Sequence, residues 1–544
     1  MYVREAIGRA LFDLGARTAF GVVGSGNFHY TNAHVEAGGR FIAARHEGGA
    51  AVMADAYARM SDEVAVLSLH QGCGYTNALT GIVEAAKSHT SLLVLTAEAP
   101  DPKSNFFIDQ QAIGQGCGAV TRRVRSAATA VADLAGAYEI CATQKRTVVL
   151  NIPIDVQDCL VPETVAVAPV TAPGAPRPPH GDLDEFVELL EAAERPVFVA
   201  GRGARGGAAK QALAELADRC GALLATSAVS RGMFEGHPWA IDVAGGFSTP
   251  LAAELISDAD LIVGWGCALN MWTMRHGRLI GDDAKVVQVD LDPDALGRHR
   301  PVDLGIWAGV AETAADASAR LTGRDSTKVG YRTSEVGERI GTDGRWHRVP
   351  FDDQSTDGLI DPRLLSARLN DLLPRERVLS VDSGNFLGYP SMYLDVPDEY
   401  GFCFTQAFQS VGLGLATAIG AAIAQPDRLP IAACGDGGFL MGVNELETAV
   451  RLKLPLLVIV YNDAQYGAEV HHFGPGADLD TVTFPDTDIA AIARGFGCAA
   501  LTVNRLDDLH PLTAWLDRPD GPMVLDAKVV SEDAAWWLVE AFGH

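Results

Sequence analysis

Two aspartates in the last quarter of the chain, Asp436 and Asp463, have the surroundings expected of a metal site. Each follows a predicted β-strand, the first ending at Cys434 and the second spanning 456–461. The carboxyl ends of parallel strands meet at one edge of a sheet, so these two carboxylates should converge there. Carboxylate oxygens are ligands that Mg²⁺ prefers. The sequence therefore predicts a magnesium ion held by both aspartates and by the phosphates of a ligand.

Three glycines, Gly435, Gly437 and Gly438, surround the first of these aspartates. Glycine lets a backbone turn tightly beside a ligand. A helix is predicted over 444–452, and its amino end would face an anion. The alternative is an ordinary surface turn rich in Gly and Asp. The second aspartate, which follows a neighbouring strand, favours the ligand site.

A third carboxylate, Glu47, lies in the segment RHEGGAAVMADAYAR at 45–59. The small apolar residues after it keep a helical period, so this helix should pack closely against another element. A carboxylate at such a buried place is costly unless it is paired or protonated. The alternative role is a favourable interaction with the helix dipole. The residues alone leave both roles open.

The elements that must position these residues are short apolar strands that alternate with helical patterns. Examples are VAVLSL at 64–69, ADLIVGWG at 259–266 and PLLVIVYND at 455–463. Continuous apolar strands separated by helices indicate parallel sheets that are covered on both faces. We therefore expect an α/β protein with three doubly wound parallel-sheet domains.

The domain boundaries are predicted from two stretches of low hydrophobicity. A chain of 544 residues is too long for one hydrophobic core. The stretch 168–182 is rich in Pro and Ala, and the stretch 322–358 is polar and rich in Gly, so both are expected to be linkers. The predicted domains are 1–167, 182–322 and 358–544.

Composition excludes several classes of partner. A net charge of −26 argues against nucleic acid and anionic membranes, which need a basic surface. No apolar run reaches the length of a membrane span, and the first residues predict an amphipathic helix rather than a signal peptide. The nine cysteines are scattered and form no C-x-x-C pair. They predict reduced thiols in a cytoplasmic protein, without disulfides or zinc.

Taken together, these segments resemble the signatures of thiamine-diphosphate enzymes, specifically the acetolactate synthase-like group. The segment 435–463 resembles the G-D-G…N-N signature, and 45–59 resembles the cofactor-activating Glu with its helix. The segment 71–100 resembles the S-G-P-G-x-T-N turn, 107–114 the Gln loop, and 409–428 the M-G-x-G-x-P-A-A-I-G run. The resemblance covers nearly the whole chain, in the order pyrimidine-binding, central and diphosphate-binding domain.

The resemblance implies thiamine diphosphate and Mg²⁺ as cofactors. Glu47 would then bind N1′ of the aminopyrimidine from an apolar pocket, where desolvation raises the pKa of a carboxyl group. Asp463 stands where the family usually has Asn, and the backbone carbonyl of Gln465 would be a third protein ligand of the metal. Val411 would fold the cofactor into its V shape. The residues expected at the cofactor are Glu47, Ser383, Asn385, Val411, Gly435, Asp436, Gly437, Gly438 and Asp463. For Ser383 and Asn385 the alternative is a plain turn.

The predicted substrate pocket departs from acetolactate synthase. His70, just ahead of the turn at 71–77, and Ser25 resemble benzoylformate decarboxylase, where both residues handle the carboxylate and protons of a 2-oxo acid. The alternative for His70 is a structural histidine. Further along, YGAEVHHF at 466–473 replaces an apolar wall, so an inward orientation implies a polar substrate, and an outward one a solvated lid helix. The expected catalytic residues are Glu47 and His70, and the expected substrate contacts are Ser25, Gln110, Glu469 and His472.

The central domain departs from the flavin-binding members of the group. The segments that hold FAD there correspond to VAGGF at 243–247 and GCALNMWTMRHG at 266–277, which lack most of the flavin contacts. The Gly-rich turn at 198–207 is weak support for a nucleotide. We therefore expect no FAD and a structural central domain.

Three functions remain open at this point. The first is an acetolactate synthase-like carboligase, a transferase that joins a 2-oxo acid to an aldehyde or ketone acceptor. The second is a 2-oxo acid decarboxylase, a lyase, which His70 and Ser25 favour. The third is a non-catalytic paralogue that binds the cofactor, against which the complete metal motif and Glu47 count. Because Glu47 and Asp436 lie on different domains, the resemblance implies a homodimer or homotetramer with active sites at its interfaces.

Overall fold

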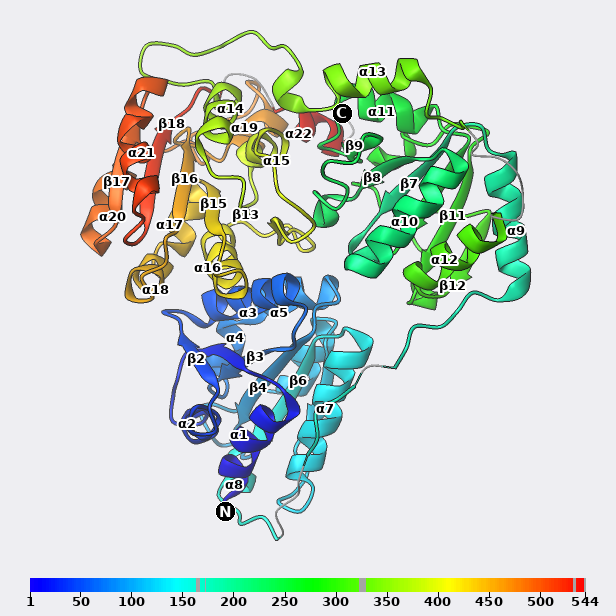
Figure 1. The fold of residues 1–544 in the computed structure, drawn as a ribbon. Helices are drawn as coiled ribbons and strands as arrows, with labels where there is room; N and C mark the ends of the chain where they lie inside the picture. The colour runs from blue at the N-terminus through cyan, green and yellow to red at the C-terminus, as the bar shows by residue number, and fades with distance from the viewer. Residues whose placement is uncertain (163–166, 172, 322–328, 532–534, 543–544) are drawn as a thin grey trace.

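The computed structural model describes residues 1–162, 167–171, 173–321, 329–531 and 535–542. They form three α/β domains, each built on a parallel sheet of six strands (Figure 1). Helices cover both faces of the sheets, and the central strands are buried, whereas edge strands such as β2 and β17 are partly exposed. The predicted three doubly wound parallel-sheet domains are therefore confirmed.

The first domain has the strand order β2-β1-β3-β4-β6-β5, and its amino-terminal helix is amphipathic as predicted. Its strands are β1 (Thr18–Gly21), β2 (Arg40–Ala43), β3 (Ala65–Leu69), β4 (Leu92–Glu98), β5 (Val120–Arg123) and β6 (Val148–Pro153). Its helices are α1 (Val3–Leu14), α2 (Phe28–Glu36), α3 (Glu47–Ser61), α4 (Cys73–Asn77), α5 (Leu79–Lys87), α6 (Gln110–Gly116), α7 (Ala130–Gln144) and α8 (Ile154–Gln157).

The second domain has the order β12-β11-β10-β7-β8-β9. Its strands are β7 (Pro196–Ala200), β8 (Leu223–Thr226), β9 (Ala240–Val243), β10 (Leu261–Trp265), β11 (Lys285–Asp290) and β12 (Leu304–Trp307). Its larger helices are α9 (His180–Ala192), α10 (Gly207–Cys220), α11 (Pro250–Ser257) and α12 (Val310–Leu321).

The third domain has the order β14-β13-β15-β16-β18-β17. Its strands are β13 (Arg377–Val381), β14 (Phe402–Phe404), β15 (Leu429–Gly435), β16 (Leu457–Asn462), β17 (Ala499–Val503) and β18 (Met523–Lys528). Its helices are α14 (Pro362–Leu372), α15 (Gly388–Tyr393), α16 (Gly414–Ala424), α17 (Asp436–Gly442), α18 (Glu445–Arg451), α19 (Gly467–Phe473), α20 (Ile489–Phe496), α21 (His510–Asp517) and α22 (Trp536–Phe542).

The stretch 322–358, which we expected to be a loose linker, contains a helix, α13 (Ser334–Asp343). Residues 322–328 lie outside the described residues. Val336 and Ile340, one helical turn apart, are buried in the core of the second domain. Two apolar positions on one helix face are too few to stand out in a polar sequence, yet they suffice to dock the helix. The exact domain boundaries stay predictions.

The first and third domains meet through helices α3 and α16, which lie against each other (Figure 1). The contact is close because both helices present small residues: a side chain at Gly420 would come within 2.2 Å of the carbonyl oxygen of Met53. One hydrophobic core runs through this junction from the sheet of one domain to that of the other. The close packing that the small residues of 45–59 predict is thus observed against the third domain.

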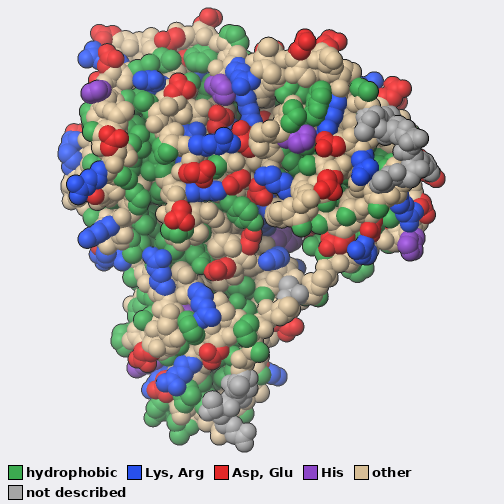
Figure 2. Space-filling model, in the orientation of Figure 1, with side chains coloured by type: hydrophobic (Ala, Val, Ile, Leu, Met, Phe, Trp, Pro, Cys, Tyr) green, Lys and Arg blue, Asp and Glu red, His purple; other side chains and the backbone are tan. Residues whose placement is uncertain are grey.

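The surface carries charges of both signs, and Figure 2 shows them dispersed over the visible face. None of the described helices is long and apolar enough to cross a membrane.

Candidate active site

The predicted metal-binding aspartates lie at the carboxyl ends of two adjacent parallel strands. β15 pairs with β16 in a register that sets Gly435 beside Tyr461, so Asp436 and Asp463 emerge at the same edge of the sheet. Asp436 is 7% exposed. Burial, and then the neighbouring carboxylate of Asp463, raise the pKa of Asp436 to about 7. Burial also raises the pKa of Asp463. The two carboxyl groups therefore lie next to each other at a site with little access to water.

This donor set fits a divalent cation. Two ionised carboxylates that lie together away from water repel each other. A bound cation replaces this repulsion with attraction to its positive charge. No described lysine or arginine is among the main causes of the pKa shift of either aspartate. The backbone carbonyl of Gln465 accepts no backbone hydrogen bond from the described residues, so it is available as a third oxygen. Diphosphate oxygens and water would complete the octahedron that Mg²⁺ requires.

The described residues contain no group of three or more His, Cys, Asp or Glu side chains arranged to hold a metal ion. The predicted magnesium site has only two such side chains, Asp436 and Asp463. Its remaining ligands would be a carbonyl group and groups that arrive with the cofactor.

The glycines of the G-D-G segment do not form the predicted turn. An additional helix, α17, begins directly at Asp436, and the helix predicted over 444–452 follows it as α18. None of Gly435, Gly437 and Gly438 has a positive φ, so backbone freedom is not the reason for glycine here. The reason is space: a Cβ at Gly437 would lie 2.5 Å from the ring of Tyr466, and one at Gly438 would lie 2.4 Å from Oδ2 of Asp382.

Asp382, a residue that the sequence analysis missed, holds the loop that carries Val411. Its fully buried carboxylate accepts the N–H groups of Ser383 at 2.8 Å, Gly412 at 3.0 Å and Leu413 at 3.1 Å. Burial raises the pKa of Asp382 to about 6, and these N–H donors oppose the shift. The loop places Val411, which is 39% exposed, in the same cavity as Asp436 and Asp463. An Asp directly after a strand was the only sequence signal for this role.

The loop at 383–388 is held by the carboxyl-terminal helix α22. The indole N–H of Trp537 donates to the carbonyl of Asn385 at 2.8 Å, and the N–H of Ala535 donates to its side-chain oxygen at 3.2 Å. A side chain at Gly388 would collide with Trp537, at 1.9 Å from its Cδ1. No local sequence pattern indicates that residues 150 positions apart would meet in this way.

A cavity of about 1850 Å³ collects most of the predicted cofactor residues. It continues between the first and second domains, where His89 and Arg202 line it. The predicted residues that line it are Ser383, Asn385, Val411, Gly435, Asp436, Gly437, Gly438, Asp463, Gln465 and Glu469.

Glu47 and His70 lie together in the first domain. Glu47 starts α3, is half-buried, and accepts a hydrogen bond from Nδ2 of Asn77 at 3.0 Å. His70 directly follows β3, and its Nδ1 accepts the N–H of Gly26 at 3.2 Å. The neutral ring therefore carries its proton on Nε2. Burial lowers the pKa of His70, and the negative charge of Glu47 opposes the shift.

The remaining predicted substrate residues are more dispersed. Ser25 is exposed on the loop between Gly24 and Gly26, which packs against the ring of His70. Gln110 is 1% exposed. Its amide donates to Asn151 and Ala97 and accepts the N–H of Gly72, so it holds the turn after His70 from within the fold. His472 is exposed on α19 and does not line the cavity.

The described part of the chain therefore divides the predicted site residues into two separate groups, which we call half-sites. Glu47, His70 and Ser25 do not line the cavity that Asp436, Asp463 and Val411 line. Among the described residues Glu47 is only half-buried, so the water-excluding apolar pocket that we expected around it is not observed.

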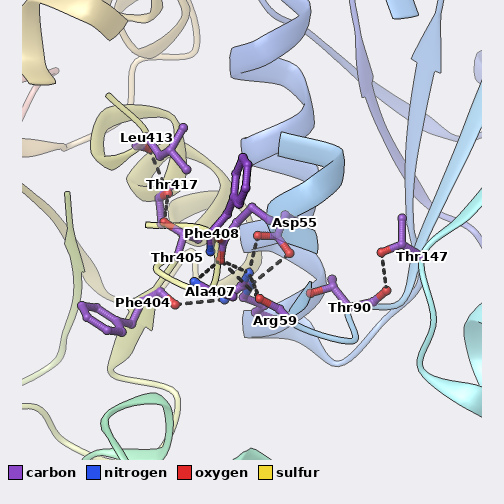
Figure 3. A network of polar contacts seen from close by, with 12 residues as sticks. Asp55, Arg59, Thr90, Thr147, Phe404, Thr405, Ala407, Phe408, Leu413 and Thr417 are labelled. Atoms are coloured by element: carbon purple, nitrogen blue, oxygen red, sulfur yellow. Dashed lines mark hydrogen bonds and ion pairs between the residues drawn. The ribbon is translucent and has the colours of Figure 1, made fainter. Parts of the chain in front are cut away.

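The other end of α3 contacts the third domain through a buried polar network (Figure 3). Arg59 lies 2.6 Å from Asp55 and 2.8 Å from Glu84, and its Nη1 donates to the carbonyl of Phe404 at 2.9 Å. Glu84 accepts the N–H groups of Ala407 at 3.0 Å and Phe408 at 2.6 Å. The network thus fixes the segment that leads to Val411.

Comparisons with known proteins agree with this arrangement. Residues 1–119 match the model of the thiamine pyrophosphate enzyme N-terminal TPP binding domain, 183–316 the central domain, and 382–527 the C-terminal TPP binding domain.

Three curated relatives span nearly the whole chain. Sulfoacetaldehyde acetyltransferase of Alcaligenes xylosoxydans xylosoxydans is 29% identical, over 91% of this chain and 87% of the relative. The putative acetolactate synthase large subunit IlvB2 of Mycobacterium tuberculosis is 28% identical, over 91% and 92%. The probable 2-ketoarginine decarboxylase AruI of Pseudomonas aeruginosa is 29% identical, over 93% and 90%.

Proposed function

Because the chain belongs to the thiamine pyrophosphate enzymes, in the acetolactate synthase-like group, we propose that it is a thiamine-diphosphate- and Mg²⁺-dependent enzyme that forms or cleaves the bond next to the carbonyl of a 2-oxo acid. We propose carboligation, with an aldehyde or ketone as the acceptor, as its leading activity. The relatives bear the names of a synthase, an acetyltransferase and a decarboxylase, so the family supports the reaction class and leaves the acceptor open.

One observation carries the proposal: the adjacent carboxylates of buried Asp436 and half-buried Asp463 share a cavity with Val411. The pair would hold Mg²⁺ and, through it, the diphosphate, and Val411 would support the bend of the cofactor. Thiamine diphosphate, when bound, supplies a carbanion at C2 that attacks the carbonyl of a 2-oxo acid. Glu47 would share its proton with the aminopyrimidine, with Asn77 fixing the orientation of its carboxyl group.

The separation of the half-sites supports an assembly of at least two copies, with Glu47 of one copy completing the cavity of another. Both halves carry exposed apolar side chains, which a partner surface would cover. Those near the two halves in sequence include Val23, Phe28, Phe106, Phe107, Phe408, Val411, Leu440 and Met441.

Mixing two inactive variants tests this assembly. Glu47→Gln and Asp436→Ala damage opposite halves, so a mixed dimer would contain one intact and one doubly damaged site. Random exchange of subunits should restore up to about a quarter of wild-type activity. No restoration, with subunit exchange verified by mass spectrometry, would show that both residues act within one copy.

Decarboxylation without carboligation is the second candidate, and His70 favours it. With Nδ1 occupied by the N–H of Gly26, His70 would present a proton on Nε2 to the carbon that loses CO₂. Glu469, an exposed carboxylate in the cavity, would favour substrates with a polar or cationic end in either case.

Product analysis separates these functions. The purified protein, loaded with Mg²⁺ and thiamine diphosphate, is incubated with pyruvate, benzoylformate and 2-oxo acids that carry a basic group, each with and without an acceptor aldehyde. A carboligase yields CO₂ and a ketol, a decarboxylase yields CO₂ and an aldehyde, and a non-catalytic paralogue yields neither although it binds the cofactor.

A further inference from the structure

Glu445, the first residue of helix α18 in the third domain, binds the backbone just before Glu47. Its Oε1 accepts the N–H of His46 at 3.0 Å and the N–H of Arg45 at 3.2 Å. Its Oε2 accepts the hydroxyl of Thr448 at 2.7 Å. The two bound peptide groups come from residues 399 and 400 positions away in the sequence and lead directly into Glu47.

This carboxylate is buried, with 1% of its surface exposed. A buried carboxylate is tolerated only where hydrogen bonds replace its water. Burial raises the pKa of Glu445, and the N–H groups of Arg45 and His46 oppose that shift. The start of a helix also attracts negative charge. Glu445 and the first turn of α3 therefore stabilise each other across the domain junction.

Gly49, in the first turn of α3, makes room for this contact. A Cβ at Gly49 would lie 2.4 Å from Oε1 of Glu445 and 2.7 Å from its Cδ. Gly49 has no positive φ, so its backbone does not require glycine. Glycine inside a helix costs about 1 kcal/mol relative to alanine. The close approach of Glu445 explains why glycine occupies this position despite its lower helix propensity.

We propose that Glu445 is a positioning residue that holds Glu47 in the place where it can activate the cofactor. The proposal rests on the function proposed above for Glu47. A misplacement of about 1 Å can lower a rate about 10²-fold, so the start of α3 must be held firmly. Asn77 orients the carboxyl group of Glu47, whereas Glu445 fixes the backbone from which that side chain projects.

The test compares three variants with two matched controls. Glu445→Ala removes the acceptor, Gly49→Ala displaces it by steric conflict, and Glu445→Gln keeps one acceptor oxygen. Glu447→Gln is the control on the same helix, because Glu447 forms only partly exposed ion pairs with Arg45 and Arg451. Gly136→Ala is the control for alanine in a helix, because a Cβ at Gly136 meets nothing within 4 Å.

The main readout is the rate of hydrogen–deuterium exchange at C2 of bound thiamine diphosphate, measured by acid quench and NMR. The dissociation constant of the cofactor and the thermal midpoint of the cofactor-free protein are measured beside it. We expect Glu445→Ala and Gly49→Ala to slow the exchange about 10- to 100-fold, and Glu445→Gln to slow it less. The dissociation constant should stay within about threefold, because the diphosphate half is untouched. Both controls should exchange at the wild-type rate.

Two results would overturn the proposal. One is wild-type exchange in Gly49→Ala and in the Glu445 variants while Glu47→Gln is slow. The other is a loss of cofactor binding that accounts for the slower exchange. If Glu445→Ala does not fold, Gly49→Ala and Glu445→Gln decide between these results. Normal exchange in Glu47→Gln would instead contradict the proposed role of Glu47, so failure of the proposed function is distinguishable.

Discussion

The guanidinium of Arg59 in helix α3 lies 2.8 Å from the carboxylate of Glu84 in helix α5, and both side chains are buried. The same carboxylate accepts two backbone N–H groups from the third domain. One ion pair inside the first domain thereby fixes the segment that leads to Val411.

Replacing Glu84 by Gln should lower the free energy of unfolding by about 3–5 kcal/mol, because it leaves Arg59 buried with part of its partner charge removed. Chemical denaturation measures the change. Arg125→Gln, which removes an ion pair whose arginine is exposed, should lower the free energy of unfolding far less. Equal effects of the two substitutions would show that burial of the network contributes nothing.

Glu47→Gln should abolish catalysis while the cofactor remains bound. The amide preserves the size of the side chain and its hydrogen bond with Asn77, but it cannot share a proton with the aminopyrimidine. We expect turnover to fall by at least about 10²-fold. Gel filtration followed by cofactor assay measures retention. Turnover close to that of the wild type would refute the assignment of Glu47.

Asp436→Ala and Asp463→Ala should each release the cofactor upon dialysis. Each removes an oxygen from a cation that requires nearly octahedral coordination. Thermal stabilisation by Mg²⁺ plus thiamine diphosphate should disappear in both variants and persist in the exposed control Asp480→Ala. Chelation of the wild type with EDTA should reproduce the loss. If both variants keep the cofactor as firmly as the wild type, the metal is bound elsewhere.

His70→Ala should distinguish decarboxylation from carboligation. If Nε2 of His70 donates the proton to the carbon that loses CO₂, aldehyde formation should fall about 10²–10⁴-fold. The residual product should shift toward ketol when an acceptor aldehyde is present. The ratio of aldehyde to ketol is the measurement, because a merely structural effect changes the total rate and leaves the ratio alone.

The buried His34 in helix α2 should make the protein less stable as the pH falls. His34 is 1% exposed, and burial, with a contribution from Arg17, lowers the pKa of its imidazole. The unfolded chain, where a histidine has a pKa of about 6.5, therefore binds more protons than the folded one. The contribution of His34 to stability is complete above that pH and is lost as the pH falls below it.

His34→Leu should remove this part of the pH dependence. Urea unfolding at pH 7.5 and 5.5 measures the difference in stability, which should be smaller in the variant than in the wild type. His29→Leu, on the exposed side of the same helix, controls for the loss of a histidine. An unchanged difference in His34→Leu would assign the acid sensitivity to other groups.

The sequence by itself determined the order and type of the elements and the places of the chemical motifs. Apolar strands separated by helical patterns require covered parallel sheets, because such strands leave no polar face for water. The chain order of strands β15 and β16 placed Asp436 and Asp463 at one edge, where the structure has them. These predictions succeeded because each depends on the spacing of apolar residues within one strand or helix, which can be read from neighbouring positions in the sequence.

Only the tertiary structure decided which distant residues hold those motifs in place and which of the motifs lie apart from one another. Glu445 binds the backbone before Glu47, Asp382 holds the loop of Val411, and Trp537 holds Asn385. Each contact joins segments that are 30 to 399 positions apart, and no local period encodes it. The G-D-G glycines are likewise explained by the side chains that approach them rather than by a turn. The separation of Glu47 from Asp436 and Asp463 is of the same kind, since it follows from how the domains pack around α3 and α16.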